Sequence, residues 1–514
     1  WFRGLPAIKY NTDDRSLTER KTTEDKGNCY AMSFVYSGCF QGEVLKDQLN
    51  QTRMMLGHSG GSFSLSAREN EMFKAPEVIL SYSSRGMNQL SQNLHQCIRK
   101  HICRGKYKEQ VRPVLINSWE ASYFDFTGDT IYELAKAAKE VNIDMLVMDD
   151  GWFGKRDDDN SGLGDWFVNE KKLGGTLGNL IERINDLGVK FGIWIEPEMV
   201  SEDSELYRKH PDWALTIPGR RPVRSRNQLV LDFSRKEVVD EIYSQICKVL
   251  DQGNIEYVKW DMNRSLMDIY SATTKDQGRV LHDYVLGLYD FLERLVQRYP
   301  NLLIEGCSGG GGRFDAGMMY YTPQIWCSDN TDAIDRLQIQ YGTSFGYPVS
   351  VVGSHVSAVP NHQTGRKTPL HTRGVVAMSG TFGYELNLMN LSKEEKQEIR
   401  EQIAEYKNYA PIIQNGLYYR LSNPTEEEIC AWEFVYTDEK EQSKVLLNIV
   451  MQAIHGNMTV NYVKLQGLEE TAVYREEKSG KKDIPDQHLC MEDMPLPVEL
   501  GEYQAYQYCF VRES

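Results

Sequence analysis

The stretch Ile255-Glu-Tyr-Val-Lys-Trp-Asp-Met-Asn-Arg264 opens as a short, mostly apolar run and closes with four polar residues around the carboxylate of Asp261. The opening residues predict a strand. A buried strand has no need of Lys259, Asp261 and Asn263 at its end. The C-terminal ends of parallel strands, however, are where barrel and open α/β enzymes place the residues that meet a substrate. The stretch therefore predicts a strand whose C-terminal end contributes residues to a substrate-binding site. Ordinary charges on an exposed loop are the alternative.

Strand and helix patterns alternate on both sides of this stretch, over roughly 300 residues. We predict strands at residues 113–119, 145–148, 190–195, 255–258, 302–304, 324–326, 349–353 and 374–378. Helices are predicted at 177–187 and 282–299, and after the capping boxes Thr130-Ile-Tyr-Glu133 and Ser234-Arg-Lys-Glu237, the latter helix ending at Gly253. About eight such units favour an α/β fold built on a (β/α)8 barrel, with a doubly wound open sheet as the alternative.

β-rich segments flank this barrel. We expect a partial N-terminal β-sandwich with a connecting helix at 1–107, the catalytic barrel at 108–415 and a C-terminal antiparallel β-sandwich at 416–514. Flanking strands are predicted at 30–36, 78–82, 444–450, 458–463, 471–474 and 503–511, and helices from residue 88 and at 393–407. Because the sequence opens at Trp1 in mid-pattern and without a signal peptide, we expect it to be part of a longer, cytoplasmic protein.

The charge balance narrows the class of partner. Lys and Arg number 58 against 73 Asp and Glu, which gives a formal net charge of −15. Such a surface repels phosphate backbones and anionic lipid, so we expect neither a nucleic acid nor a membrane partner. No apolar run reaches the roughly 18 residues of a membrane span. The ten cysteines form no CxxC pair, which predicts free thiols in a reducing compartment.

No cofactor and no metal are predicted. The ten histidines show no HxxxH or HxH spacing. The run Asp157-Asp-Asp-Asn-Ser-Gly162 is similar to the start of a calcium loop, but Val168 stands where a bidentate Glu is required. The run Ser308-Gly-Gly-Gly-Gly312 lacks the GxGxxG spacing of a phosphate loop. We expect its glycines to let the backbone approach a sugar closely.

Polar and aromatic residues recur where the predicted strands end. They are Asn117, Ser118, Trp119, Asp149, Asp150, Trp152, Trp194, Glu196, Glu198, Lys259, Asp261, Asn263, Cys307, Ser308, Asp329, Asn330, Ser354 and His355. In a barrel these ends meet at one mouth. Carboxylates and amides suit sugar hydroxyls, and an indole suits the apolar face of a sugar ring. This mixture predicts a site for a polyhydroxylated ligand.

Glycoside hydrolysis requires two carboxyl groups, a nucleophile and a proton donor. Asp261 suits the nucleophile because the neighbouring Lys259 cation should lower its pKa. Asp329 suits the acid because Trp326 and Cys327 are apolar neighbours and no cation is adjacent in sequence. Glu196 and Glu198 compete for these roles, but Pro197 between them indicates a fixed turn that supports Trp194.

Four motifs together resemble the α-galactosidases of glycoside hydrolase family 36, most closely the bacterial melibiase or raffinase type. They are Met148-Asp-Asp-Gly-Trp152, Gly192-Ile-Trp-Ile-Glu-Pro-Glu198, Lys259-Trp-Asp-Met-Asn-Arg264 and Trp326-Cys-Ser-Asp-Asn-Thr-Asp332. The resemblance covers essentially the whole chain. It implies a retaining reaction, with the two carboxyl groups about 5–5.5 Å apart, on melibiose, raffinose or stachyose.

The resemblance also implies roles for individual residues. Asp261 would attack the anomeric carbon and Asp329 would be the acid/base, with Asp332 and Asp335 as alternatives for the latter. The sugar-binding set would be Trp119, Asp149, Asp150, Trp194, Arg226, Lys259, Trp260, Asn263, Cys307, Ser308 and Gly309. Of these, Asp149 and Asp150 would hold the 4- and 6-hydroxyls, Asn263 the 2-hydroxyl, and Trp119 would lie near the leaving group.

Two further expectations rest on the same resemblance. Family members carry a full β-sandwich before the barrel, which helps to build tetramers, so we expect a homo-oligomer. The small residues Cys307 and Ser308 suit galactose, but an α-N-acetylgalactosaminidase, which would bind N-acetylgalactosamine there, is an alternative. A non-catalytic galactoside-binding barrel is the alternative from another class.

Overall fold

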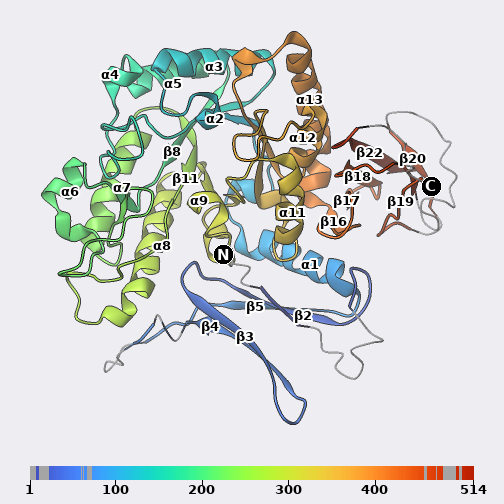
Figure 1. Ribbon diagram of the computed structural model, residues 1–514, viewed down its shortest axis with the longest axis horizontal. Coiled ribbons are helices and arrows are strands. Elements are labelled where there is room, and N and C mark those ends of the chain that lie inside the picture. Colours follow the sequence, from blue (N-terminus) through green and yellow to red (C-terminus); the bar gives the residue numbers. More distant parts are fainter. Residues whose placement is uncertain are drawn as a thin grey trace.

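Eight parallel strands close into a barrel at the centre of the computed structural model (Figure 1). The structure describes residues 22–59, 61, 63–65, 72–456, 460–469, 472–477, 494–496 and 501–513, and the backbone of 7–10. The barrel strands are β6 (Leu115–Asn117), β7 (Met145–Met148), β8 (Lys190–Ile195), β11 (Ile255–Trp260), β12 (Leu303–Gly306), β13 (Gln324–Trp326), β14 (Val352–Ser357) and β15 (Thr381–Glu385). β15 pairs with β6 and closes the ring, so the predicted barrel is confirmed over the open sheet.

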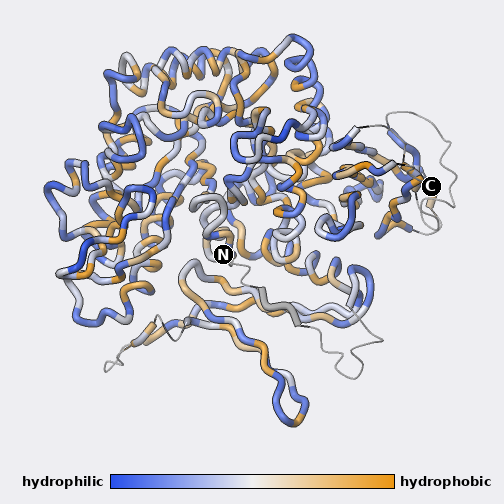
Figure 2. Tube along the Cα trace, in the orientation of Figure 1, coloured by the Kyte–Doolittle hydropathy of each residue, from blue (hydrophilic) through white to orange (hydrophobic). Residues whose placement is uncertain are grey.

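Helices follow the barrel strands, and Figure 1 shows the longer ones as an outer layer. They are α2 (Trp119–Ser122), α3 (Gly128–Glu140), α4 (Glu170–Leu173), α5 (Leu177–Asp186), α6 (Glu205–Lys209), α7 (Lys236–Leu250), α8 (Val280–Arg298), α9 (Ser308–Gly311), α10 (Ala316–Met319), α11 (Ala333–Thr343), α12 (Leu370–Met378) and α13 (Lys393–Asn415). A short ribbon of β9 (Met199–Val200) and β10 (Leu229–Val230) lies among the loops. In Figure 2 apolar segments recur along the strands and alternate with polar ones along the helices.

Two predicted strands were wrong in place or type. The run 374–378 lies in helix α12, and the eighth strand is β15, a few residues later. This helix contacts α11, α13, β14 and β22, so nearly all of its residues are buried. A helix buried all round has no polar face, and its sequence cannot be distinguished from a buried strand by periodicity. The strand expected at 349–353 begins at Val352, after a 3-10 turn.

Both predicted capping boxes were also misplaced. Helix α3 is capped by Thr127, whose side chain and that of Thr130 satisfy each other's backbone N–H groups. Helix α7 begins at Lys236 without a side-chain cap, because Ser234 donates its hydroxyl to Asp232 instead. Local hydrogen bonds of this kind compete with helix caps and leave no separate signal in sequence.

An antiparallel sheet precedes the barrel. The pairing order is β1 (Ala7–Tyr10), β2 (Cys29–Phe34) and β5 (Val78–Ser83), which confirms strands close to 30–36 and 78–82. Strands β3 (Phe40–Lys46) and β4 (Thr52–His58) form a separate hairpin. Helix α1 (Gly86–Cys97), the connecting helix predicted from residue 88, packs on β2 and β5 and leads toward the barrel (Figure 1).

A second antiparallel sheet follows helix α13. Its order is β16 (Leu417–Arg420), β17 (Ile429–Thr437), β18 (Ser443–Met451), β22 (Ala505–Arg512) and β20 (Tyr474–Glu476). One face joins the main core through residues such as Trp432 and Phe434. The other packs on the ribbon of β19 (Tyr462–Val463) and β21 (Met494–Pro495), forming a second layer. Parts of the strands predicted at 458–463 and 471–474 lie outside the described residues.

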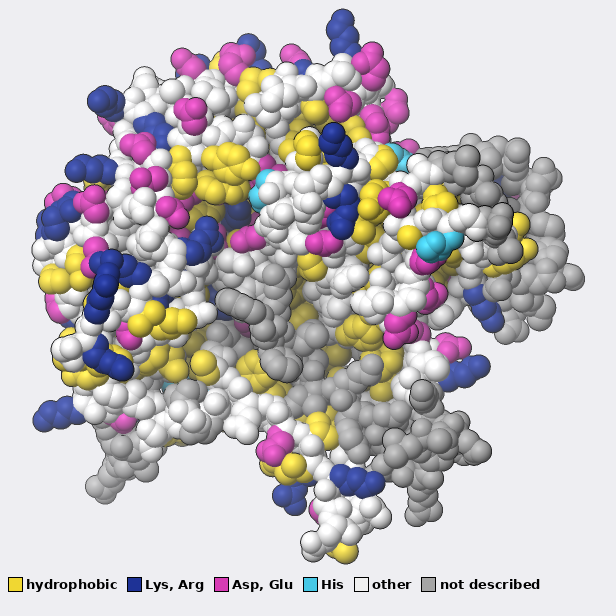
Figure 3. Space-filling view, in the orientation of Figure 1, with side chains coloured by type: hydrophobic (Ala, Val, Ile, Leu, Met, Phe, Trp, Pro, Cys, Tyr) yellow, Lys and Arg dark blue, Asp and Glu magenta, His cyan; other side chains and the backbone are white. Residues whose placement is uncertain are grey.

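The surface carries charges of both signs. On the face shown in Figure 3 acidic and basic side chains are interspersed around the rim, and apolar patches lie between them. Among the residues that the structure describes, no helix combines the length and apolar character of a membrane span.

Candidate active site

Asp261 follows β11 at the carboxyl end of the barrel, and it is buried. Its Oδ1 accepts hydrogen bonds from the backbone N–H groups of Met262, at 2.8 Å, and Gly309, at 3.0 Å. Its Oδ2 accepts from Asn263 Nδ2 at 2.8 Å and from the indole of Trp194 at 3.2 Å. Donors on both oxygens fix the carboxylate plane and favour the ionised form.

The cation that acts to lower the pKa of Asp261 is bound to another acid. Lys259 Nζ lies 2.9 Å from Oδ2 of Asp149, at the end of β7. The same oxygen accepts from Asn117 Nδ2 at 2.6 Å, at the end of β6. Three strand ends are thereby joined, as the barrel prediction required. Lys259, Asp149 and Asn117 are all buried.

Asp150 lies in a separate ion pair. Arg156 donates to both of its carboxylate oxygens, with Nη2 at 2.8 Å from Oδ2 and Nε at 3.0 Å from Oδ1. Both side chains are buried. Sequence reasoning missed Arg156, because the surrounding run of acidic residues reads as a solvated loop. The acidic loop itself remains at the surface, where the Asp157 carboxylate pairs with Lys172.

Asn263 connects several parts of the mouth. Besides its bond to Asp261, its side-chain oxygen accepts a hydrogen bond from Arg226, which approaches from the loop before β10. Its backbone N–H donates to Oε1 of the buried Glu196. The Arg226 side chain is exposed and lies close enough to Asp329 to lower that group's proton affinity.

Asp329 follows β13, two strands from Asp261. Its Oδ1 accepts from the indole of Trp326 at 3.0 Å and from the Cys307 thiol at 4.0 Å. Sequence reasoning treated Trp326 only as an apolar neighbour. Its hydrogen bond could have been anticipated, because a tryptophan three residues before a carboxylate in a turn can reach it.

The loop at 307–311 joins the two carboxyl groups. Gly309 donates to Asp261, whereas Gly310 lies against the Asp329 backbone, where a Cβ would meet the Asp329 nitrogen at 2.3 Å. Gly310 also has a φ of +76°, which disfavours other residues. A Cβ at Gly311 would meet the Cys327 carbonyl at 2.5 Å. Because they lack a Cβ, these two glycines allow the 327–329 loop to pack closely against them. We had expected the glycines to make room for a sugar instead.

The two carboxyl groups have opposite electrostatic environments. Burial acts to raise the pKa of Asp261, but Lys259 and the backbone hydrogen bonds outweigh it and lower the pKa. Asp329 is exposed as a residue, yet its carboxyl lies against Trp326 and the 307–311 loop. This partial burial and the charge of Asp261 raise the pKa of Asp329. Asp261 is thus held ionised, as a nucleophile must be, and Asp329 is biased toward protonation, as a general acid must be.

The other four carboxylates that the sequence offered for this site have structural partners. Glu198 is fully buried and accepts from Arg313, Trp260 and Tyr284. Glu196 is also fully buried, and burial and Asp261 raise its pKa to about 8. Asp332 caps α11, and Asp335 accepts from Asn330 Nδ2 at 2.7 Å.

Two predicted sugar-binding residues differ in their access to the mouth. Trp260 is fully buried: its indole donates to Glu198 at 2.8 Å and packs on Phe291 of α8, 5.0 Å between ring centroids. Strand residues alternate, so Lys259 and Trp260 point to opposite faces. The substrate contact predicted for Trp260 does not fit this position. Trp119 is partly exposed beside the β6 end, packed on Tyr123 and Phe124.

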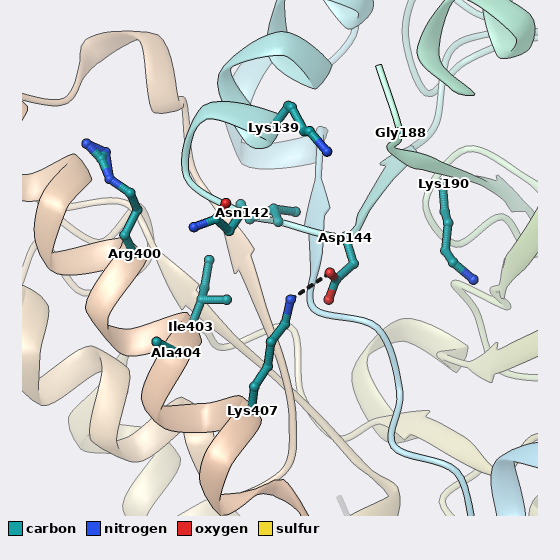
Figure 4. Close-up of a pocket in the computed structure, with 10 residues that line it drawn as sticks. Lys139, Asn142, Asp144, Gly188, Lys190, Arg400, Ile403, Ala404 and Lys407 are labelled. Atoms are coloured by element: carbon teal, nitrogen blue, oxygen red, sulfur yellow. Dashed lines mark hydrogen bonds and ion pairs between the residues drawn. The ribbon is translucent and has the colours of Figure 1, made fainter. Parts of the chain in front are cut away.

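A depression of about 400 Å³ lies at the opposite end of the barrel, beside the start of β7 and β8 (Figure 4). It is lined by Lys139, Asn142, Ile143, Asp144, Gly188, Lys190, Arg400, Ile403, Ala404 and Lys407. Lys407 is paired with Asp144 at 2.7 Å and Lys190 with Glu256 at 2.6 Å. In Figure 4 Arg400 points away from Lys139, so these cations do not converge on one ligand. This end of a barrel is also not where catalytic residues lie.

Within the described part of the chain, no group of three or more His, Cys, Asp or Glu side chains is arranged for a metal ion. A parallel barrel whose strand ends bring together two carboxyl groups of opposite bias, with indoles beside them, has the architecture of a glycoside hydrolase.

Comparison with known proteins gives the family. Residues 72–416 match the family described as Melibiase, and residues 15–66 match the glycosyl hydrolase family 36 N-terminal domain. The chain belongs to the melibiase family of glycoside hydrolases.

Among its relatives, the bifunctional α-galactosidase/sucrose kinase AgaSK of Mediterraneibacter gnavus is 61% identical over 99% of this chain and 53% of its own length. The α-galactosidase Mel36A of Lactobacillus acidophilus is 46% identical over 99% of this chain and 69% of its own. The α-galactosidase AgaA of Geobacillus stearothermophilus, solved as a variant with raffinose, superposes with a TM-score of 0.94 at 44% identity, covering 99% of this chain and 69% of that one. The chain thus spans about half the length of the first relative and about two thirds of the others.

Proposed function

We propose that the chain is a retaining α-galactosidase that hydrolyses terminal α-galactosyl residues of oligosaccharides such as melibiose, raffinose and stachyose. The observation that carries this proposal is the pair of Asp261 and Asp329, with opposite pKa shifts, at the mouth of the barrel. The family is retaining, and relatives at this identity are named α-galactosidases. A variant of AgaA has also been solved with stachyose.

In the first step Asp261 attacks the anomeric carbon while the bond to the leaving oxygen breaks, giving a β-galactosyl-enzyme. Asp329 gives its proton to the leaving oxygen. In the second step Asp329 takes a proton from water, which attacks the anomeric carbon and releases Asp261. This division suits a carboxylate whose donors keep it ionised and a second carboxyl group that is biased toward protonation.

The sugar contacts follow from the polar groups around Asp261. We assign the 4- and 6-hydroxyls to Asp149 and Asp150, whose orientation is supported by Lys259 and Arg156. Asn263 and the loop at Cys307, Ser308 and Gly309 are assigned to the 2-hydroxyl side, with Arg226 beside them. Trp194 forms a wall and Trp119 the leaving-group side.

Turnover of 4-nitrophenyl α-D-galactoside and of raffinose tests the proposal. Wild type should release nitrophenol and galactose, and Asp261→Ala should lose this activity while still binding galactose. Binding without turnover by the wild type would favour the non-catalytic galactoside-binding alternative. A parallel assay with 4-nitrophenyl N-acetyl-α-D-galactosaminide tests the α-N-acetylgalactosaminidase alternative, and we expect little or no turnover of it.

The remaining proposals concern the whole protein. We propose domains at 1–107, 108–415 and 416–514, a homotetrameric assembly and a cytoplasmic location. The family resemblance supports the assembly. The cysteine spacing supports the location. Gel filtration with light scattering tests the assembly, for which we expect four copies in one particle.

A further inference from the structure

The Trp326 indole occupies an unusual place beside the proposed acid/base. It lies at the end of β13 and is 3% exposed. Its N–H donates to Oδ1 of Asp329 at 3.0 Å. Asp261 accepts from several N–H donors, whereas Trp326 supplies the one N–H that we find on the Asp329 carboxyl in the described part of the chain.

Two basic side chains hold the indole in place. The Arg336 guanidinium lies over the ring at 4.5 Å and is fixed by the carbonyl groups of Ser328 and Asn330, both at 2.7 Å. The His355 ring lies 4.5 Å from the Trp326 ring, and its Nδ1 is 3.2 Å from a Glu385 oxygen. The indole therefore cannot rotate away from Asp329 without displacing buried, hydrogen-bonded groups.

We propose that Trp326, held by its contacts with Arg336 and His355, is the positioning residue of the acid/base Asp329, and that its N–H sets how readily Asp329 gives and takes its proton. This inference rests on the proposed function. A cation over an indole face draws electron density from the ring, which makes its N–H a stronger donor. A donor to a carboxylate favours the ionised form. It therefore acts in the same direction as the positive charges of Lys259 and Arg226. It opposes burial and the negative charges of Asp261 and Glu385, which together bias Asp329 toward protonation.

The substitution Trp326→Phe tests this role, because it keeps an aromatic ring but removes the N–H. Raffinose has an alkoxide leaving group that needs a proton, whereas 4-nitrophenoxide needs little assistance. We expect kcat/KM for raffinose to fall about tenfold or more, and that for 4-nitrophenyl α-galactoside to change by less than about threefold. The alkaline limb of kcat/KM for raffinose should move to higher pH, because Asp329 loses a donor to its ionised form.

Trp432→Phe is the matched control. The Trp432 indole also donates to a side chain, Ser379 Oγ at 2.7 Å, but it lies where the C-terminal sheet meets the barrel domain. Its loss should affect both substrates alike and leave the pH profile unchanged. Equal losses of both substrates in Trp326→Phe, with an unmoved alkaline limb, would mean that Trp326 is only structural and would overturn the proposal.

A titration that needs neither turnover nor a folded Trp326 variant is available from the indole N–H resonances. We expect one of them to shift with pH in the wild type and to stop shifting in Asp329→Asn. If no indole resonance depends on Asp329 in this way, the proposal is wrong. A wild type that cleaves neither substrate would instead overturn the proposed function, and the titration would still decide whether the Trp326 N–H is coupled to the protonation of Asp329.

Discussion

Lys259 Nζ lies 2.9 Å from Asp149 Oδ2, and both side chains are buried at the mouth of the barrel. The cation that holds Asp261 ionised is therefore oriented by a residue that we assign to the sugar. In the proposed site, Asp261 and the carboxylate that we assign to a galactose hydroxyl are thus coupled through one ammonium group. Binding a hydroxyl at Asp149 should reorganise little, since the carboxylate is already fixed by Lys259 and Asn117.

This ion pair predicts strong energetic coupling. Asp149→Asn or Lys259→Met alone should lower the free energy of unfolding by about 3–5 kcal/mol, because each leaves a buried charge without its partner. The double variant should lose clearly less than the sum of the two. Denaturant unfolding of the four proteins in this cycle measures the difference.

The exposed pair of Lys136 and Glu133, at 2.9 Å on helix α3, is the control for that cycle. Its coupling energy should be no larger than the error of the measurement, because water screens both charges. If the Lys259 and Asp149 substitutions prove additive, the proposed coupling is wrong.

Gly310→Ala should disable the site without touching a catalytic side chain. The added Cβ would overlap the Asp329 nitrogen, and the φ of +76° adds strain. Displacing Asp329 by a fraction of an ångström to one ångström should lower kcat/KM about 100-fold. Kinetics on raffinose and a thermal melt check both effects.

Gly342→Ala is the matched substitution, because Gly342 lies in helix α11 with open space around its Cβ position. It should keep full activity and gain about 0.5–1 kcal/mol of stability. Full activity in Gly310→Ala would show that Asp329 tolerates displacement, and the close packing of the 307–311 loop would then have no catalytic role.

Sequence was sufficient for most of the barrel because its strands are short apolar runs between amphipathic helices. It failed at α12, where burial on every side removes the polar face that identifies a helix. The positions of most site residues also follow from one rule, that parallel strand ends meet at one mouth. Trp260 was assigned to the sugar on its motif alone, against the alternation that turns it outward.

Contacts that depend on the path of the loops could not be predicted from the sequence. The Arg156 pair with Asp150, the Arg336 guanidinium over Trp326 and the approach of Gly310 to Asp329 depend on how the loops fold and pack in space. No periodicity or spacing encodes them. These contacts orient the side chains of the candidate site. The sequence therefore predicted which residues lie at the mouth of the barrel better than it predicted how their side chains are oriented.

A buried glutamate in the C-terminal sheet predicts a pH dependence of stability. Glu433 on β17 is fully buried, and burial raises its pKa to about 8. The folded protein therefore holds this proton more tightly than the unfolded chain, whose glutamates titrate near pH 4.5. The stabilisation that comes from holding this proton is complete below pH 4.5 and is lost as the pH rises toward 8. The free energy of unfolding should fall by on the order of 3 kcal/mol between pH 5 and pH 8 for this reason.

Glu433→Gln should remove this contribution. The difference in melting temperature between variant and wild type should shift in favour of the variant as pH rises over that window. The exposed Glu426→Gln, in the loop before β17, should follow the wild type throughout. A parallel course of wild type and Glu433→Gln would mean that Glu433 is ionised in the folded protein.

The central claim is that Asp261 becomes covalently bound to galactose. Asp261→Gly leaves space at the anomeric carbon, so azide should restore turnover of 4-nitrophenyl α-D-galactoside. The attack comes from the side that Asp261 vacated. We therefore expect β-galactosyl azide as the product, identified by the coupling constant of its anomeric proton. An α-galactosyl azide, or no rescue in Asp261→Gly but rescue in a variant of another carboxylate, would contradict this claim.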